Sequence, residues 1–172
     1  MGRILFDSRS DVTRAEFTSL MAKFPTGVAV VTAFGVDGAP WGMTCSSLCS
    51  VTLSPPTLLV CVRDASPTLA AVLARGAFAV NMLHERARTT AELFASGAAD
   101  RFDRVSWQGR PEAGGGPHLT EDAHAVAHCR VTETRPVGDH VVVFGEVTGL
   151  EQWPKPRPLL YGLRGYAAWP SP

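Results

Sequence analysis

Short apolar runs, separated by turns that contain glycine or proline, recur along this chain and limit the folds open to it. Residues 28–34 form a nearly continuous run of β-branched and other apolar residues, which is typical of a strand buried on both faces. Shorter apolar runs follow at residues 58–62 and 78–83, and residues 123–134 alternate at period two. These runs do not alternate regularly with helical segments. We therefore expect a mainly β protein, a β-barrel with a few peripheral helices rather than a doubly wound sheet.

Two tight turns and a terminal strand pair support this interpretation. Asp37-Gly38 is a hairpin signal, because both residue types tolerate the backbone conformation that a short turn requires. Gly138-Asp139 forms a second tight connection and leads into an apolar strand over residues 140–150. A last strand pair is expected over residues 159–169.

Three helices are expected among the strands, over residues 13–24, 66–75 and 89–96. A Thr-x-x-Glu spacing, typical of a capping box, opens the first helix at Thr13 and the third at Thr89. A Ser-Pro pair opens the second helix, and a glycine follows both the second and the third.

Composition and charge exclude several classes of function. Of the 172 residues 45% are apolar, which is enough to build a core, so we expect one globular domain over residues 1–172. The 16 basic and 16 acidic residues balance, and such a chain has no basic excess to bind nucleic acid, while zero net charge is compatible with self-association. Because no apolar run is long enough to cross a bilayer and residues 1–10 lack an apolar signal core, we expect a cytoplasmic protein without a membrane partner.

The cysteines and histidines do not predict a metal site. Four cysteines, at positions 45, 49, 61 and 129, include no C-x-x-C pair, and we expect buried free thiols rather than disulfides or a zinc ribbon. His124 and His128 are two strand steps apart and share a face, but the alternation turns Cys129 to the opposite face. We therefore expect no bound metal.

The densest polar cluster is G-M-T-C-S-S-L-C-S at residues 42–50. Its hydroxyls donate and accept hydrogen bonds without charge, which suits a heterocycle with several carbonyls and ring nitrogens. An ordinary turn or a solvated strand face explains the same composition. The chain has no G-x-G-x-x-G, P-loop, H-E-x-x-H or G-x-S-x-G motif, so a bound nucleotide must be held without a glycine-rich loop.

Three further places offer chemistry, each with a plain structural alternative. Ser66-Pro67-Thr68 opens a helix whose N–H groups can bind a phosphate, although simple capping explains the residues as well. His140 follows a tight turn and can meet a ligand, or it can be solvated. Arg164-Gly165-Tyr166 offers a guanidinium and an aromatic plane, or only surface packing.

These segments together resemble the short-chain flavin reductase family, whose members are FMN-binding split-barrel reductases that serve two-component flavin monooxygenases. The resemblance rests on the order and spacing of F-P-T-G-V (24–28), G-M-T-C-S-S (42–47), S-V (50–51), P-P (55–56), F-A-V-N (78–81), L-F-A (93–95), G-G-G-P (114–117), G-D-H (138–140), G-E-V (145–147) and Tyr161 with Tyr166.

The resemblance implies a homodimeric split β-barrel with flavin in a groove near the subunit interface. Residues implied to line the flavin ring and ribityl chain are Thr26, Gly27, Thr44, Cys45, Ser46 and Ser47, with Ser50 close by. Residues implied around them are Ser66 and Thr68 at the phosphate, Phe94 and Ala95 closing one side, and Tyr166 near the flavin. Residues 138–140 are implied to meet the nicotinamide nucleotide, with His140 as the catalytic-site residue that positions it.

By this resemblance the chain is expected to be an NAD(P)H:flavin oxidoreductase that reduces FMN or FAD with NADH or NADPH. The reduced flavin is expected to feed a separate flavin-dependent monooxygenase. The cofactors carry the hydride chemistry, so no protein acid or nucleophile is required. The alternatives are a non-catalytic flavin- or haem-binding split barrel, a pyridoxamine-phosphate-oxidase-like oxidase, and a purely structural β domain. The G-D-H turn favours the reductase.

Overall fold

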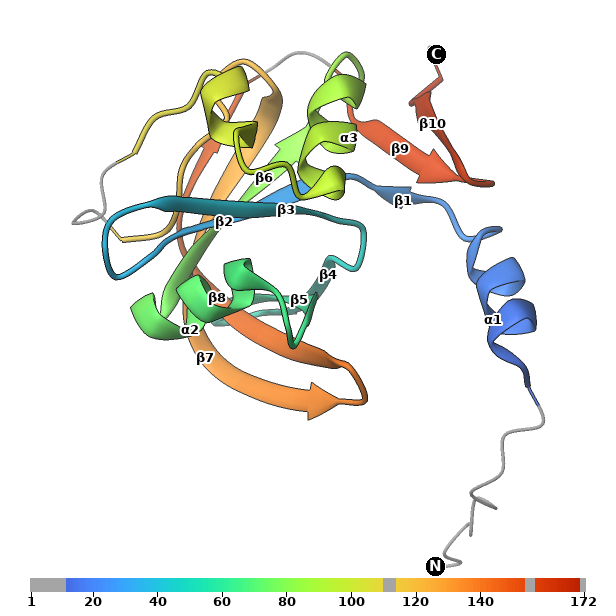
Figure 1. The fold of residues 1–172 in the computed structure, drawn as a ribbon, viewed down its shortest axis with the longest axis horizontal. Helices are drawn as coiled ribbons and strands as arrows, with labels where there is room; N and C mark the ends of the chain where they lie inside the picture. Colours follow the sequence, from blue (N-terminus) through green and yellow to red (C-terminus); the bar gives the residue numbers. More distant parts are fainter. Residues whose placement is uncertain (1–11, 110–113, 154–156, 171–172) are drawn as a thin grey trace, which may run out of the picture.

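The computed structural model describes residues 12–109, 114–153 and 157–170. Its main sheet has seven antiparallel strands in the order β3-β2-β6-β7-β8-β5-β4. Their bounds are β2 Ala29–Phe34, β3 Pro40–Cys45, β4 Cys49–Leu53, β5 Pro56–Arg63, β6 Ala77–Leu83, β7 Ala123–Val137 and β8 His140–Gln152. The expectation of a mainly β fold is confirmed, and Figure 1 shows the sheet curling into a barrel.

The curl of the sheet follows from one short connection. β3 and β4 are the two outer strands of the sheet, yet only Ser46, Ser47 and Leu48 separate them in sequence. Three residues can reach only a short distance even when extended, so the two edge strands of the sheet must lie close together. The Ser47 hydroxyl accepts a hydrogen bond from the Cys61 N–H (3.0 Å) and donates one to the Cys61 carbonyl (3.1 Å). This hydroxyl holds the connection against β5.

The terminal strand pair is also confirmed, as part of a small second sheet. It contains β1 Thr26–Gly27, β9 Leu159–Gly162 and β10 Gly165–Ala168, in the order β1-β9-β10. The Asp37-Gly38 and Gly138-Asp139 turns join β2 to β3 and β7 to β8, as predicted, and both glycines have a positive φ.

Two of the three helices begin where the sequence predicts. α1 Arg14–Met21 has the complete Thr13 capping box, although it ends three residues before the predicted end. α2 Pro67–Arg75 begins after Ser66 and ends at Gly76, which has a left-handed backbone. Figure 1 shows α1 standing to one side of the barrel.

The capping box expected at Thr89 is wrong. α3 Arg88–Ser96 begins one residue earlier, after Ala87, and has no side-chain cap. Glu92 instead pairs at 2.8 Å with the guanidinium of Arg88, the first residue of the helix, and makes no capping hydrogen bond to the backbone. A 3-10 helix, η1 Arg101–Arg104, follows and lies beside α3 in the fold.

The core has two main layers, and β2 contributes to both. Inside the barrel Val31 packs with Phe78 and with Val72 of α2. On the outer face of the same strand Val30 packs with Phe94 of α3 and with Phe102. Because β2 is covered on both faces, every one of its residues is buried. Burial on both faces explains the nearly continuous apolar run that the sequence shows at this strand.

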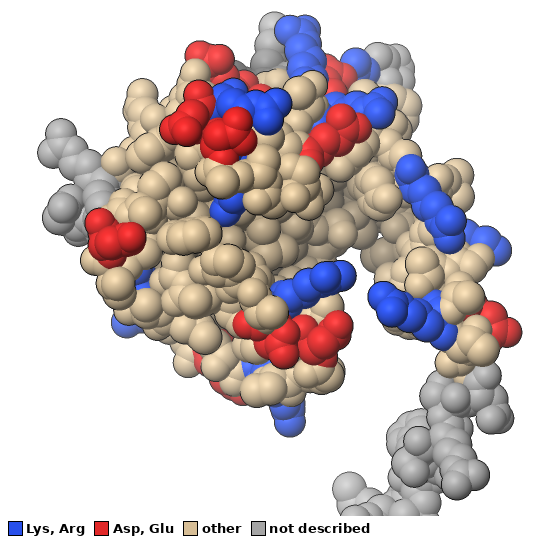
Figure 2. All heavy atoms as spheres, in the orientation of Figure 1, with Lys and Arg blue, Asp and Glu red and all other residues tan. Residues whose placement is uncertain are grey.

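No helix among the described residues is long and apolar enough to cross a membrane. On the face of the molecule in Figure 2, acidic and basic side chains both occur and wide uncharged areas lie between them.

Candidate functional site

The hydroxyl-rich segment at residues 42–50, which runs from the end of β3 into β4, has a structural role as well as an exposed face. Thr44 donates its hydroxyl hydrogen to the Ala91 carbonyl of α3 at 2.6 Å, which ties the end of β3 to that helix. Cys45 is buried in the barrel core, where burial raises the pKa of its thiol. The side chains of Ser46 and Ser50 are exposed. The segment therefore presents single hydroxyls to two sides rather than one continuous polar face.

A groove of about 960 Å³ lies on one side of this segment. Its walls come from β3, the start of α2, the end of α3 with η1, and the first residue of β8. The predicted site residues that line it are Thr44, Ser66, Thr68, Phe94, Ala95 and His140. The volume is at the upper end of the range usual for small-molecule sites.

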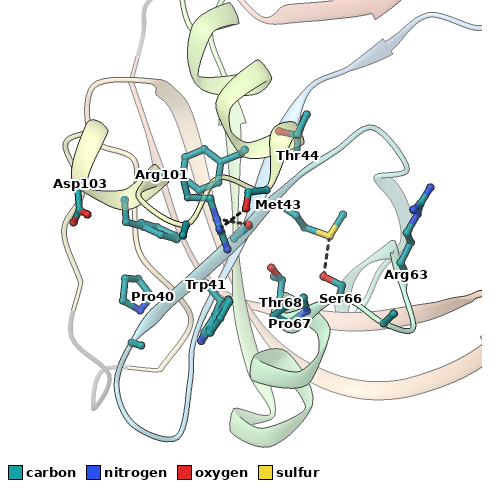
Figure 3. A pocket seen from close by; sticks show the side chains of 18 of the residues that line it. Pro40, Trp41, Met43, Thr44, Arg63, Ser66, Pro67, Thr68, Arg101 and Asp103 are labelled. Atoms are coloured by element: carbon teal, nitrogen blue, oxygen red, sulfur yellow. Dashed lines mark hydrogen bonds between the residues drawn. The ribbon is translucent and has the colours of Figure 1, made fainter.

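The start of α2 faces this groove without a side-chain cap. Ser66 makes no capping hydrogen bond, and its hydroxyl lies 3.8 Å from the sulfur of Met43 (Figure 3). Pro67 follows at the first helical position, and Arg63 lines the groove beside them. An uncapped helix start with a cation nearby suits a phosphate, because backbone N–H groups and the helix dipole both favour an anion.

His140 lines the groove at the start of β8 and is held by its neighbour. Its Nδ1 lies 2.8 Å from a carboxylate oxygen of Asp139. The hydrogen bond from His140 lowers the pKa of Asp139, and the charge of His140 adds to this effect. The Asp139 carboxylate is therefore ionised at neutral pH, and it orients the imidazole ring.

Two groove residues were missed by the sequence reasoning, Trp41 and Arg101. Arg101 is buried, and it donates hydrogen bonds to the carbonyls of Gly42 (3.0 Å) and Ala98 (2.7 Å). Its guanidinium lies 5.7 Å from the centre of the Trp41 ring. Figure 3 shows both side chains beside β3. Arg101 belongs to a segment without periodicity, so only the fold brings it to the groove.

A second cavity of about 680 Å³ lies against α1. Thr26, Ser46 and Ser47 line it, together with Tyr161 and Arg164. The predicted residues are thus divided between two cavities on either side of one segment.

Four of the predicted residues line neither cavity: Gly27, Cys45, Ser50 and Tyr166. Tyr166 packs instead against Tyr161, with ring centres 5.1 Å apart, and under the Arg88 guanidinium at 5.7 Å. In this single chain its ring is therefore in contact with protein side chains.

All four cysteines are free thiols, but the expectation that they are buried is wrong for one of them. Cys45 and Cys129 are buried, Cys61 is partly buried, and Cys49 is exposed. Burial raises the pKa of Cys129 to about 12, so this thiol is neutral at physiological pH. Cys49 is exposed because β4 is an outer strand whose residues are all exposed.

Comparison with known proteins places these features in a family. Residues 21–170 match the model of the flavin reductase like domain. A flavin reductase (NADPH) of Lentzea aerocolonigenes is 52% identical over 158 residues, covering 92% of this chain and 91% of the relative. A reductase subunit of a flavin-dependent monooxygenase from Mycobacterium tuberculosis is 37% identical over 147 residues, covering 84% of this chain and 76% of the relative.

Solved structures agree with this result. The NADH:FAD oxidoreductase of Streptomyces globisporus C-1027, solved with NAD and FAD fragments, superposes with a TM-score of 0.83 at 34% identity. The superposition covers 91% of this chain and 93% of the other. With the family model matching most of its length, the chain belongs to the flavin reductase family.

Proposed function

We propose that this chain reduces FMN or FAD with NADH or NADPH in the groove between β3, α2, α3 and β8. One observation carries the proposal: residues that are distant in the sequence line this one groove. Thr44, the uncapped start of α2, Phe94 and His140 come from four elements and line the same space. Relatives named for NADPH-dependent and NADH-dependent flavin reduction support the choice of reaction.

The residues of the groove fit a flavin and a nicotinamide nucleotide. The start of α2, with Ser66, Thr68 and Arg63, would hold a phosphate group. Ala95, backed by the buried ring of Phe94, offers an apolar wall to a flat ring, and Thr44 contributes a polar edge next to it. A mostly apolar wall with a few polar groups is typical of cofactor sites.

A bound nicotinamide nucleotide would supply the hydride for reduction of the flavin. The protein would contribute orientation, since holding two reactants in position lowers the entropic barrier to their reaction. His140 would position the nicotinamide nucleotide, with its own ring held by Asp139 at 2.8 Å. No side chain needs to transfer a proton in this scheme.

The reduced flavin would then pass to a separate monooxygenase. The relative from Mycobacterium tuberculosis is named as the reductase subunit of such an enzyme, which supports this step. We place the chain in the cytoplasm, where nicotinamide nucleotides are available. Its four free thiols are compatible with a reducing compartment.

We also propose that the chain is a homodimer. Apolar side chains of α1 are exposed, among them Phe17 (57%) and Leu20 (63%), and Phe24 just after the helix is also exposed (63%). None of the residues of α1 is buried, so the helix packs little against the rest of the chain. A contiguous apolar patch of this kind marks an interaction surface. The second cavity lies against the same helix, so a partner subunit seated there would cover Thr26 and Ser47.

The reaction is tested by following NADH and NADPH oxidation by absorbance, without flavin, with FMN and with FAD. We expect oxidation that depends on both protein and flavin, and the preferred pair identifies the cofactors. Tight flavin binding without oxidation would instead support a binding barrel or a pyridoxamine-phosphate-oxidase-like oxidase. If the chain neither binds nor reduces flavin, the proposal is wrong.

The role of His140 is tested by His140→Ala, with His124→Ala as the matched control. His124 lies on β7 and does not line the groove. We expect His140→Ala to raise KM for the nicotinamide nucleotide by roughly tenfold, since one lost hydrogen bond corresponds to about 1 kcal/mol or slightly more. The control should leave KM unchanged. An unchanged KM and kcat in His140→Ala would exclude the positioning role.

A further inference from the structure

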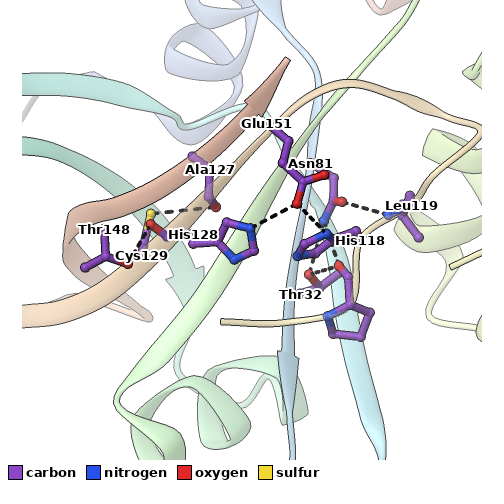
Figure 4. A network of polar contacts seen from close by, with 10 residues as sticks. Thr32, Asn81, His118, Leu119, Ala127, His128, Cys129, Thr148 and Glu151 are labelled. Carbon is purple, nitrogen blue, oxygen red and sulfur yellow. Dashed lines mark hydrogen bonds and ion pairs between the residues drawn. The ribbon is translucent and has the colours of Figure 1, made fainter. Parts of the chain in front are cut away.

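Three side chains outside the groove converge on one point of the barrel wall. They are His118, which follows the G-G-G-P segment, His128 on β7 and Glu151 on β8. One ligand atom of each lies within 4.8 Å of the others. Figure 4 shows both imidazole rings turned toward the same carboxylate. None of the three lines either cavity of the candidate site.

The distances in this cluster leave room for a metal ion between the three side chains. Nδ1 of His118 lies 3.4 Å from Oε1 of Glu151, and Nε2 of His128 lies 3.6 Å from the same oxygen. Both distances are longer than charge-assisted hydrogen bonds, at about 2.7–2.9 Å. Zinc–ligand bonds of about 2.0–2.1 Å in a tetrahedron separate neighbouring ligand atoms by about 3.3–3.4 Å. The two separations from the carboxylate oxygen are close to this value, and all three ligand atoms lie within 4.8 Å of one another.

The fold places His128 and Glu151 on one face. In the β7–β8 ladder His128 is opposite Gly149, and Glu151 lies two residues further along β8. Residues two apart on a strand share a face, so Glu151 is the diagonal neighbour of His128. A Cβ at Gly115 would lie 3.0 Å from Nδ1 of His128, so this glycine lets the chain lie close to the ring. His128 is thereby held with Nε2 toward the carboxylate.

His118 is fixed by the backbone on both sides. Its own N–H and carbonyl pair with Gln108 at 2.7 and 2.9 Å. The preceding carbonyl, of Pro117, accepts hydrogen bonds from Thr32 and Asn81, and the following N–H, of Leu119, donates to Asn81. A ligand whose main chain is anchored so closely has little entropy to lose when a metal binds.

The cluster is also accessible to a cation. His118 and His128 are partly buried, and each turns one ring nitrogen toward the Glu151 carboxylate. The Glu151 side chain is 49% exposed, so solvent and a metal ion have access to the site.

We propose that His118, His128 and Glu151 form a binding site for a divalent transition-metal ion such as Zn²⁺. Two imidazole nitrogens and a carboxylate are a donor set for zinc and its neighbours rather than for Mg²⁺ or Ca²⁺, which prefer oxygen ligands. Three protein ligands leave a fourth position for water. The ion links the loop before His118 to the β7–β8 hairpin and stabilises the fold. The pair considered from the sequence, His124 with His128, shares only His128 with this cluster.

The test is titration of the purified full-length chain with Zn²⁺ after removal of metal by a chelator. Calorimetry should show one saturable site in the wild-type chain. His118→Asn, His128→Asn and Glu151→Gln should each weaken binding by at least the roughly 10- to 100-fold that loss of a supporting partner costs. Glu151→Gln leaves the core unaltered, so it keeps the test valid if a histidine variant fails to fold.

Matched controls separate this site from other ligands. His124→Asn changes a histidine of the same strand that is not part of the cluster, and Cys49→Ser removes the exposed thiol. Both variants should bind Zn²⁺ as the wild type does. With Zn²⁺ at about 100 times Kd we expect Tm to rise by roughly 5–10 °C in the wild type, but not in the triple variant that combines His118→Asn, His128→Asn and Glu151→Gln. Wild-type protein without saturable binding, or a triple variant that binds like wild type, would overturn the proposal.

Discussion

At the scale of single residues, one buried amide organises the region between the barrel and the loop that follows residue 113. Asn81 on β6 is fully buried, and its amide nitrogen lies 3.1–3.2 Å from the Val30 carbonyl, the Thr32 hydroxyl and the Pro117 carbonyl. Its amide oxygen accepts a hydrogen bond from the Leu119 N–H at 2.8 Å. A side chain that both donates and accepts is required here, because a carboxylate or a hydrocarbon leaves buried groups unpaired.

We expect Asn81→Leu to destabilise the protein by about 2–5 kcal/mol, because more than one buried polar group loses its partner. Urea unfolding followed by circular dichroism measures the loss. Thr32→Val is the matched control, since it keeps the shape of the side chain. It removes two hydrogen bonds, to the Pro117 carbonyl and from the Asn81 amide, but both of these groups keep other partners. The control should cost about 1–2 kcal/mol, less than Asn81→Leu. Equal effects of the two substitutions would show that Asn81 does not organise the network.

At the scale of elements, a glycine allows α3 and η1 to lie close to β3. A Cβ on Gly42 would lie 2.9 Å from the Phe94 ring and 3.1 Å from the Phe102 ring. It would also lie 3.1 Å from a methyl group of Thr32. Contacts this short require α3 and η1 to move outward, and these two elements form one wall of the groove.

We expect Gly42→Ala to lower the free energy of unfolding by about 1–3 kcal/mol, as overpacking of a close interface does. The displaced wall should also raise KM for flavin. Urea unfolding and flavin-dependent NADH oxidation measure the two effects. Gly165→Ala is the control, because a Cβ there would meet nothing closer than 3.9 Å. If Gly42→Ala behaves like the control, close packing of α3 on β3 does not shape the groove.

Helices and strands that are set by residues nearby in the sequence could be predicted, whereas packing between distant segments could not. The Thr13 capping box and the Ser66-Pro67 helix start each depend on neighbouring residues only. The apolar run at β2 can be seen in the sequence, although the burial of both its faces depends on the fold. The start of α3 could not be predicted, because Glu92 has Arg88 as a competing partner.

The same distinction applies to the residues of the candidate site. Its hydroxyls could be predicted from a local cluster, and His140 from a tight turn. Arg101 could not, because its partners, the carbonyl of Gly42 and the ring of Trp41, are distant in sequence. Nor could the burial of Cys45, since that depends on the curl of the whole sheet. The His118–Glu151 contact likewise exists only once the barrel has formed.

At the scale of the whole molecule, the described chain leaves an apolar face without a partner. α1 projects beside the barrel (Figure 1), and Phe17, Met21 and Phe24 line the second cavity together with Ser47. Because water covers these side chains in an isolated chain, a second copy seated there would gain hydrophobic stabilisation. The same contact would bring the second cavity into the subunit interface.

We therefore expect the wild-type chain to be a dimer by light scattering after gel filtration, and Phe17→Glu with Leu20→Glu to be a monomer. Two carboxylates in an apolar interface carry a large desolvation cost, whereas both positions are exposed in the single chain and should tolerate the change. Val36→Glu is the control, since Val36 is 80% exposed in the β2–β3 turn, at the opposite end of the molecule from α1 in Figure 1.

The monomeric variant should also bind flavin more weakly, because the hydroxyls of Thr26 and Ser47 would then lie in open solvent rather than in a covered site. Fluorescence quenching of FMN or FAD measures this affinity, and circular dichroism verifies that the variant is folded. A folded monomer with wild-type affinity would mean that the first groove alone holds the flavin. A wild-type chain that is itself monomeric would exclude the dimer and leave the exposed face of α1 for another partner.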